Sequence, residues 1–293
     1  MTTAALEKLL LLYAQRFPLR RGKMRVIDSL WRAAVGDSST HRVASLKHGD
    51  FMLPCDLSAM LQRQLYFFGT YFVEEYILRC WETAAKGAKV IFDVGANAGI
   101  YSLAALAVQP DATVHAFEPT PEIAAGLRAT ARLNGLNHLH VHEVAVLDRA
   151  GQATLRRFRG ELGANEGMNF VTRDVVDPTG ERVETISLDR FCQNCEIEHV
   201  DLLKLDIQGH EPSALVGAAN MLAGGRIGTI FSELNWARDR ATACPASEVV
   251  RLLDQAGYSF SKPGKHLHWK KAGHWLRMET EIIATQSPRK AIR

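Results

Sequence analysis

Residues 93–99, DVGANAG, carry the strongest sign of the fold, because they join a buried β-strand to a helix. The segment before them, residues 89–94, predicts the strand, and a helix is expected from about Gly99 onward. Gly95 suits a turn with positive φ, and Gly99 permits close packing of the helix against the strand. Open α/β sheets bind ligands at such turns, so we expect a ligand site here.

The spacing within this loop indicates the kind of ligand. Its pattern is D-x-G-x-x-x-G, whereas loops that bind dinucleotides carry G-x-G-x-x-G. In those loops the middle glycine lets the backbone approach a pyrophosphate, but here Asn97 lies near that place and Asp93 adds a negative charge. A cofactor with cationic amino and sulfonium groups beside a ribose fits better. The loop therefore predicts S-adenosylmethionine, held by Asp93, Gly95, Asn97 and Gly99.

An acidic residue, Glu118, follows the next expected strand, residues 113–117. A carboxylate at that strand end can accept both hydroxyls of a ribose, and each charge-assisted bond contributes roughly 1.5–3 kcal/mol. Glu118 suits a nicotinamide cofactor equally well, so it is the preceding loop that favours S-adenosylmethionine. The plain structural alternative is that Asp93 and Glu118 only cap helices or form salt bridges.

Short β-rich runs alternate with helical runs beyond residue 86, which is typical of βαβ units and a mainly parallel sheet. Residues 151–181 are polar and weakly periodic, so we expect an irregular insertion there. Residues 258–285 predict an antiparallel hairpin. The fold class is therefore α/β, with a Rossmann-like domain over residues 76–293. The strands are expected at 89–94, 113–117, 139–146, 200–205 and 227–232, with a helix at 121–134.

Residues 1–75 lack this alternation and are expected to form a helical extension that partly covers the site. Apolar residues at helical spacing predict a helix over residues 6–17. A turn at 48–50 precedes a short strand, and residues 61–84 predict two helices that meet near Gly69. We expect these N-terminal helices to support a homodimer.

The composition excludes several classes of protein. The chain has 293 residues, of which 47% are hydrophobic and 23% charged, as in ordinary globular domains. The formal charge of +3 gives no concentrated basic surface, so no nucleic acid is expected as a partner. No apolar run approaches the ~20 residues of a membrane span, and no signal peptide is recognised, so a cytoplasmic protein without membrane partners is expected. Five scattered cysteines are expected to be reduced thiols.

Four segments resemble one family, the FkbM type of class I S-adenosylmethionine-dependent methyltransferases. They are LYFFGTY at 65–71, DVGANAGIY at 93–101, VETISLD at 183–189 and VDLLKLDIQGHE at 200–211, and the resemblance extends over roughly residues 50–235. It implies a seven-stranded mixed sheet of order 3-2-1-4-5-7-6 with helices on both faces. It also implies a cofactor site across the first three strands and methyl transfer to an oxygen or sometimes a nitrogen.

The resemblance adds two cofactor-binding residues and shows one departure. Tyr101, at the end of the loop segment, and Ala145, on the third strand, are the added residues. Members of the family often carry Glu where this chain has Gln208. Many members act on sugars or natural products, so the acceptor itself is not inherited from the family.

The catalytic candidates are Asp206, His210 and Glu233. Asp206 ends the strand beside the glycine-loop strand, so we expect its carboxylate to face both the cofactor and the reacting methyl group. His210, with an ordinary pKa of about 6.5, suits a general base at neutral pH, whereas the two acids need an environment that raises theirs. Each also has a purely structural alternative. No spacing predicts a metal site, and the lone C-x-x-C at 192–195 is a weak sign of zinc.

The predicted function is transfer of a methyl group from S-adenosylmethionine to a hydroxyl oxygen or amide nitrogen of a sugar, natural-product or peptide acceptor. One alternative is a module that binds the cofactor without turnover. A nicotinamide-dependent oxidoreductase is less favoured because of the loop spacing. A nucleic-acid methyltransferase is disfavoured because residues 206–209 do not form the motif used on flipped bases.

Overall fold

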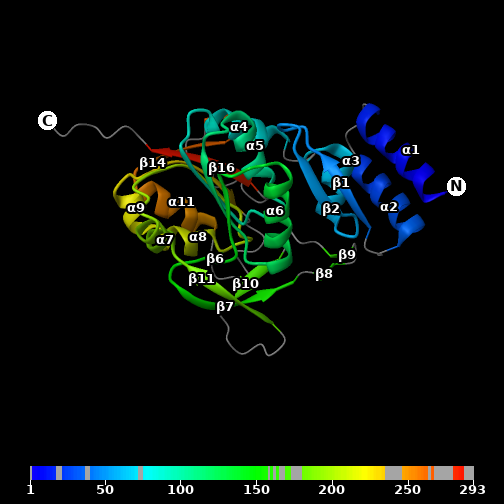
Figure 1. Ribbon diagram of the computed structural model, residues 1–293. Coiled ribbons are helices and arrows are strands. Elements are labelled where there is room, and N and C mark those ends of the chain that lie inside the picture. The colour runs from blue at the N-terminus through cyan, green and yellow to red at the C-terminus, as the bar shows by residue number, and fades with distance from the viewer. Residues whose placement is uncertain are drawn as a thin grey trace.

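The computed structural model places a large sheet at the centre of the molecule, with α1 (Thr3–Arg16) at one end and α9 (Ala219–Ala223) at the opposite end (Figure 1). The structure describes residues 2–17, 22–36, 40–71, 75–157, 159–160, 163–164, 169–172, 180–234, 246–262, 265–266 and 280–286.

The central sheet has the order β15-β14-β16-β13-β12-β3-β4-β5. The seven strands of the family's order, 3-2-1-4-5-7-6, correspond in turn to β5, β4, β3, β12, β13, β16 and β14. The predicted order is therefore confirmed. The two-residue strand β15 extends the edge beyond it. All neighbouring pairs from β5 to β13 are parallel, and β16 is antiparallel to both of its neighbours. The bounds are β3 Val90–Val94, β4 Thr113–Phe117, β5 Leu139–His142, β12 Val200–Leu205, β13 Ile227–Leu234, β14 Tyr258–Lys262, β15 Lys265–His266 and β16 Thr280–Gln286.

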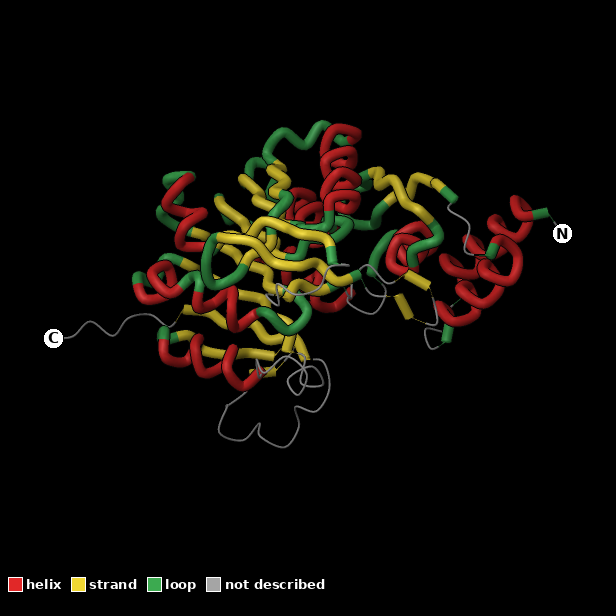
Figure 2. Tube along the Cα trace, turned by 90° about the horizontal axis from the view of Figure 1, so that it is seen from below, coloured by secondary structure: helices red, strands yellow, loops and turns green. Residues whose placement is uncertain are grey.

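Helices cover both faces of this sheet, as Figure 2 shows. Successive strand residues point to opposite faces, so Ile91 joins one hydrophobic cluster and Phe92 the other. The cluster around Ile91 includes side chains of α4 Glu75–Ala85, α5 Ile100–Val108 and α6 Pro121–Leu133. The cluster around Phe92 includes side chains of α7 Leu188–Asn194, α8 Glu211–Val216, α9 Ala219–Ala223 and α11 Ala246–Gln255.

The N-terminal segment has the expected helices together with a small hairpin. The helix predicted at 6–17 is present. Two helices also lie on either side of Gly69, as predicted: the first ends there, where Gly69 takes the left-handed φ of +69°, and the second begins at Glu75. Leu10, Trp31 and Leu65 of this segment belong to the same hydrophobic cluster as Leu103 of α5. The elements are α1 Thr3–Arg16, α2 Lys23–Val35, β1 His41–Ser45, β2 Met52–Asp56 and α3 Met60–Phe68.

The outer faces of α1 and α2 expose several large apolar side chains. Leu9 and Leu12 of α1 and Val26 and Leu30 of α2 are between 41% and 54% exposed. The homodimer expected through these helices stays a prediction.

The expectation of an irregular insertion over 151–181 was wrong, because these residues contribute strands to a second sheet of order β10-β7-β11-β6. Apolar residues alternate with polar ones in these short strands, as at Ala153 and Leu155, but the many polar residues around them make the alternation hard to recognise. Ala153, Leu155 and Val183 point inward and pack with Val171 in a small separate cluster. The expected strand 139–146 is also divided, since β5 ends in the central sheet and β6 begins in the second. The strands are β6 Ala145–Val146, β7 Gly151–Arg156, β10 Phe170–Thr172 and β11 Glu181–Ile186, and a short hairpin pairs β8 Arg159–Gly160 with β9 Gly163–Ala164.

Candidate active site

The glycine loop lies where β3 passes into α5, at the carboxyl edge of the parallel strands. Gly95 has φ +82°, and a Cβ built there would lie 2.0 Å from the carbonyl oxygen of Asp206. Gly99 has φ +81°, and a Cβ there would lie 2.3 Å from Leu127 Cδ1 on α6. Asn97 also takes a left-handed conformation, with φ +50°, which asparagine tolerates better than most residues. Backbone angle favours glycine at both positions, and at Gly95 the close approach to backbone requires it as well.

Asp93, at the end of β3, lies beneath this loop rather than at its surface. Its side chain is 1% exposed, and its Oδ2 accepts hydrogen bonds from the backbone N–H (3.0 Å) and the hydroxyl (2.6 Å) of Ser102. Burial raises the pKa of Asp93 to about 6, although the bonds from Ser102 oppose that rise. These contacts give Asp93 a structural part in holding the start of α5.

Tyr101 is also buried, at 5% exposure, against the face of the sheet. Its ring meets Trp81 edge-on at 5.5 Å between centroids, and its carbonyl accepts the indole N–H of Trp81. The ammonium of Lys204 lies 4.6 Å from the Tyr101 ring centroid. The ring of Tyr101 thus packs within the core. Its predicted contact with the cofactor stays a prediction.

Glu118 connects the glycine loop to the neighbouring strand β4. One carboxylate oxygen accepts the backbone N–H of Asn97 at 3.0 Å, and the other accepts that of Thr120 at 2.8 Å. Glu118 is thus held in a defined orientation by backbone donors at the end of its strand.

A cavity opens above these residues. Its lining includes the predicted residues Gly95, Asn97, Glu118 and Asp206, which come from the ends of three parallel strands. An adjoining apolar cavity is lined in part by Phe117, Ala145, Val171, Ile207 and His210. The structure thus brings Ala145 and His210 together beside the first cavity.

The second sheet supplies two side chains that the sequence did not single out, Leu155 of β7 and Val171 of β10, which line the cavity that contains Glu118. Asn169, just before β10, lines the same cavity, and its position in the insertion makes it a candidate for shaping the acceptor pocket from the sequence alone. The inward alternation of Ala153, Leu155 and Val183 was the signal in the sequence, but nothing in it indicates which cavity the strands would border. The insertion therefore forms part of the candidate site.

Asp206 and Glu233 lie together at the ends of β12 and β13. Gln208, which takes φ +58°, donates from its amide nitrogen to Asp206 Oδ1 at 3.0 Å and to Glu233 Oε2 at 3.1 Å. Burial and the negative charge of Asp206 raise the pKa of Glu233 to about 10. Burial acts to raise the pKa of Asp206 as well, but Lys204 and the hydrogen bonds from Glu233 and Gln208 outweigh it, so that pKa lies below its usual value.

Lys204 and Glu281 complete this group. The side chain of Lys204 is 1% exposed, and its ammonium lies 2.5 Å from Glu281 Oε1 and 3.5 Å from Asp206 Oδ2. Glu281 stands on the antiparallel strand β16, and its Oε2 has no hydrogen-bond partner among the described residues. Lys204 lies two residues before Asp206, so the sequence weakly predicts that both side chains share one face of the strand. No sequence pattern predicts that Glu281 lies beside them.

His210 and Glu211 begin helix α8. Glu211 accepts the backbone N–H groups of Ile207 and Gly209, and burial raises its pKa to about 7. His210 is the N-cap residue of this helix, and no side-chain capping bond is formed. Of the three predicted catalytic residues, Asp206 and Glu233 are therefore in one bonded group, while His210 borders the apolar cavity next to it.

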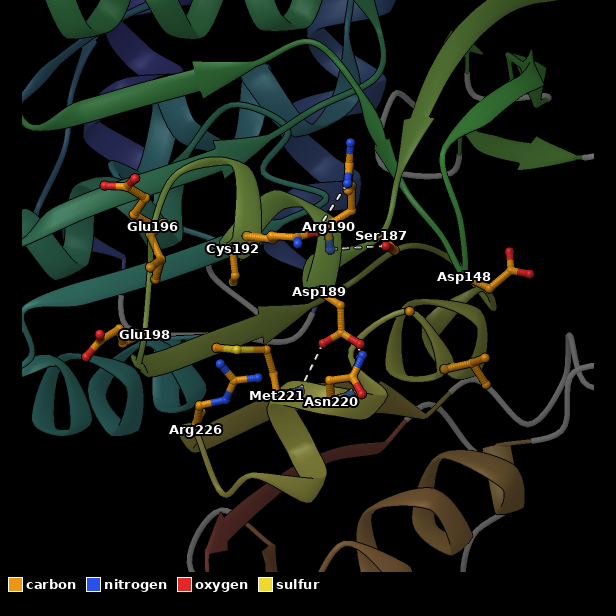
Figure 3. A pocket seen from close by; sticks show the side chains of 14 residues that line it. Asp148, Ser187, Asp189, Arg190, Cys192, Glu196, Glu198, Asn220, Met221 and Arg226 are labelled. Carbon is orange, nitrogen blue, oxygen red and sulfur yellow. Dashed lines mark hydrogen bonds between the residues drawn. The ribbon is translucent and has the colours of Figure 1, made fainter.

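A larger hollow, of about 1050 Å³, lies at the other end of the strands (Figure 3). Two of its lining residues mark the amino ends of the strands: Glu198 lies two residues before β12, and Arg226 directly precedes β13. Asp189 turns toward α9 and accepts the backbone N–H groups of Asn220 at 2.8 Å and Met221 at 2.9 Å. Open α/β sheets bind ligands at the carboxyl ends of their strands, so this hollow is not the candidate site.

The described residues hold no group of three His, Cys, Asp or Glu side chains placed to bind a metal ion. Cys192, from the C-x-x-C at 192–195, is buried in α7, and Cys195 is an exposed free thiol. Among the helices described, none has the length and apolar character needed to cross a membrane.

Comparison with known proteins agrees with this geometry. The sequence model of the methyltransferase FkbM domain matches residues 93–260, from Asp93 through the row of parallel strands to β14. The chain belongs to the FkbM methyltransferase family.

Two curated relatives of this FkbM-family chain are methyltransferases. The chain is 30% identical over 179 residues to the 2-O-methyltransferase NoeI of Sinorhizobium fredii, a match that covers 57% of this chain and 72% of NoeI. It is 36% identical over 205 residues to the 31-O-demethyl-FK506 methyltransferase FkbM of Streptomyces tacrolimicus, covering 58% and 72%. A solved O-methyltransferase from Bacillus cereus, in complex with SAH, aligns over 96% of this chain and 97% of its own with 11% identity and a TM-score of 0.43.

Proposed function

We propose that this methyltransferase uses S-adenosylmethionine to methylate a hydroxyl group on a sugar or another natural product. The observation that supports the proposal most is the cavity in which Gly95, Glu118 and Asp206 meet at the ends of three adjacent parallel strands. The oxygen acceptor is favoured because the names of both relatives, the 2-O-methyltransferase and the 31-O-demethyl-FK506 methyltransferase, specify methylation at oxygen.

The residues at the loop fit this cofactor. The approach of Gly95 to the Asp206 carbonyl leaves the loop without a side chain where the cofactor would cross it. Glu118, which backbone N–H groups hold at the end of β4 and which lines the cavity, would accept the ribose hydroxyls. The adenine ring would lie beside Ala145 and Val171, against the apolar side chains that line the small adjoining cavity.

Bound in this way, S-adenosylmethionine supplies a methyl group that is activated by its sulfonium charge. The chain then has two tasks, which are to align the acceptor and to receive the proton of its hydroxyl. Asp206 is the proposed proton acceptor because it lines the cavity and because Lys204 and Gln208 keep it ionised at neutral pH, not because its pKa is raised as expected from the sequence. Glu233 would keep its own proton and donate it to Asp206 as a hydrogen bond.

The test is calorimetry with S-adenosylhomocysteine, followed by assays of methyl transfer to sugar and natural-product alcohols. We expect one binding site per chain and transfer to oxygen. Correctly folded protein that binds no S-adenosylhomocysteine would refute the proposal. Binding without transfer to any acceptor would favour a non-catalytic module, and a response to NADH instead would favour an oxidoreductase.

A further inference from the structure

Three carboxyl groups lie in a row across the carboxyl-end edge of the sheet. Glu233 on β13 pairs directly with Glu281 on β16, and Asp206 follows the last parallel pair, Leu205 with Ser232. Because aligned residues of neighbouring strands point to the same side of a sheet, all three carboxyls share one face. Like charges directly opposite each other destabilise a sheet, so this row requires a cation, a proton or both.

A buried lysine supplies the cation. Lys204 precedes Asp206 by two residues on the same strand face, and its ammonium forms the 2.5 Å ion pair with Glu281. It lies farther from Asp206, at 3.5 Å. In the part of the chain that the structure describes, this is the cation in contact with the row. One positive charge therefore faces three acids, and Glu281 is its nearer partner.

A shared hydrogen-bond donor shows that two of the acids lie side by side. The amide nitrogen of Gln208 donates to Asp206 Oδ1 at 3.0 Å and to Glu233 Oε2 at 3.1 Å. Two ionised carboxylates that share a buried site repel each other, so one of the two is expected to hold a proton. Burial raises the pKa of Glu233 to about 10, which assigns that proton to Glu233 at neutral pH.

We propose that Asp206 and Glu233 form a proton-sharing pair that receives the acceptor's proton, and that Lys204 and Glu281 are positioning residues that set the charge of this pair. The proposal rests on the methyl transfer proposed above. The O–H bond of the acceptor breaks, and its proton passes to Asp206. The electron pair stays on oxygen and forms the new bond to the methyl carbon, while the electrons of the broken carbon–sulfur bond go to sulfur. The pair then holds two protons and releases one to water.

Two further acids face this pair from other elements. Glu211 on α8 is bonded to the backbone of residues 207 and 209, and Asp93 on β3 is bonded to Ser102. Burial raises the pKa of both, to about 7 for Glu211 and about 6 for Asp93. The changes tested below leave both acids in place, so differences between variants report on Lys204 and Glu281.

The experiment is an infrared titration of the cofactor-free protein, which follows the band of protonated carboxyl groups. Above the pKa values of Glu211 (about 7) and Asp93 (about 6), the wild type should still show such a band and should lose it with a midpoint near pH 10, and Glu233→Gln should remove this high-pH band. Glu281→Gln deletes an anion, so the midpoint should fall by about one pH unit. Lys204→Met deletes the cation, so the midpoint should rise by about 1–3 units. The variant with both changes should have a midpoint close to that of the wild type, because it has lost one positive and one negative charge.

The acidic limb of the kcat profile should shift in the same two directions. The control is Glu248→Gln on the surface of α11, which should leave the titration unchanged. Absence of this high-pH band from the wild type, or shifts of the two single variants that are zero or of equal sign, would overturn the proposal. If Lys204→Met does not fold, the fall in Glu281→Gln and its reversal in the double variant still decide. If S-adenosylhomocysteine fails to bind while the titration behaves as expected, the proposed function fails and the charge arrangement stands.

Discussion

The glycine loop and the acidic row stabilise buried negative charge in different ways. At the loop, Glu118 is held by backbone N–H groups of Asn97 and Thr120, which lie within 21 residues of it in the chain. In the row, charge is balanced by side chains, and Lys204 meets Glu281 across 77 residues. Backbone donors cannot gain or lose protons, whereas the carboxyls of the row can. The comparison teaches that the loop orients its carboxylate with fixed backbone donors, whereas the row balances its charge with side chains that can exchange protons during a reaction.

The largest effect is expected from Gly95→Ala, because this glycine of the loop lies directly against the backbone of Asp206 in the acidic row. Its new Cβ would lie 2.0 Å from the Asp206 carbonyl, so the loop or the end of β12 must move. We expect affinity for S-adenosylhomocysteine to fall by at least about 100-fold, which corresponds to about 2.7 kcal/mol. Calorimetry measures the affinity, and thermal unfolding shows whether the variant folds.

A matched glycine separates the steric effect from backbone strain. Gly87 also has positive φ, at +80°, but a Cβ there would meet nothing within 4 Å. Gly87→Ala should therefore cost only the strain, about 1 kcal/mol of stability, and leave affinity unchanged. Equal affinities for the Gly95→Ala variant and the wild type would show that the loop does not form the binding site.

The next effect in size is expected from Glu118→Ala, which acts on the binding region alone. The variant loses the ribose contacts and the two backbone bonds, so affinity for S-adenosylhomocysteine should fall by about 10- to 100-fold. The infrared titration of the acidic row should not change. The control is Glu143→Gln, an exposed acid paired with Arg128, which should bind as the wild type does. Unchanged affinity in Glu118→Ala would remove Glu118 from the cofactor site.

The smallest effect concerns an acid that belongs to neither region. Asp189 lies in one of the segments that resemble the family, yet its carboxylate accepts the first N–H groups of α9. Asp189→Ala should lower stability by about 1 kcal/mol, as for a lost helix cap, without changing cofactor affinity. Chemical denaturation and calorimetry test this together. Loss of affinity at normal stability would mean that the hollow in Figure 3 contributes to binding.

The same division explains what the sequence could predict. That Gly95, Asn97 and Glu118 meet at one edge of the sheet could be predicted, because a strand-to-helix turn and the next strand end are local patterns, and parallel strands bring them together. Asp93 was identified with them, but spacing does not show that its carboxylate turns inward to Ser102. Glu281 was missed because its place depends on the pairing of β16 with β13, which no local pattern specifies. The strands of the second sheet were missed because each is short and mostly polar.

The most direct test of the central claim is a crystal structure of the protein with S-adenosylhomocysteine. We predict that the ribose hydroxyls contact Glu118, that the adenine lies beside Ala145, and that the sulfur faces Asp206 across the glycine loop. A ligand bound in the hollow beside Asp189, or one whose sulfur points away from Asp206, would contradict this account.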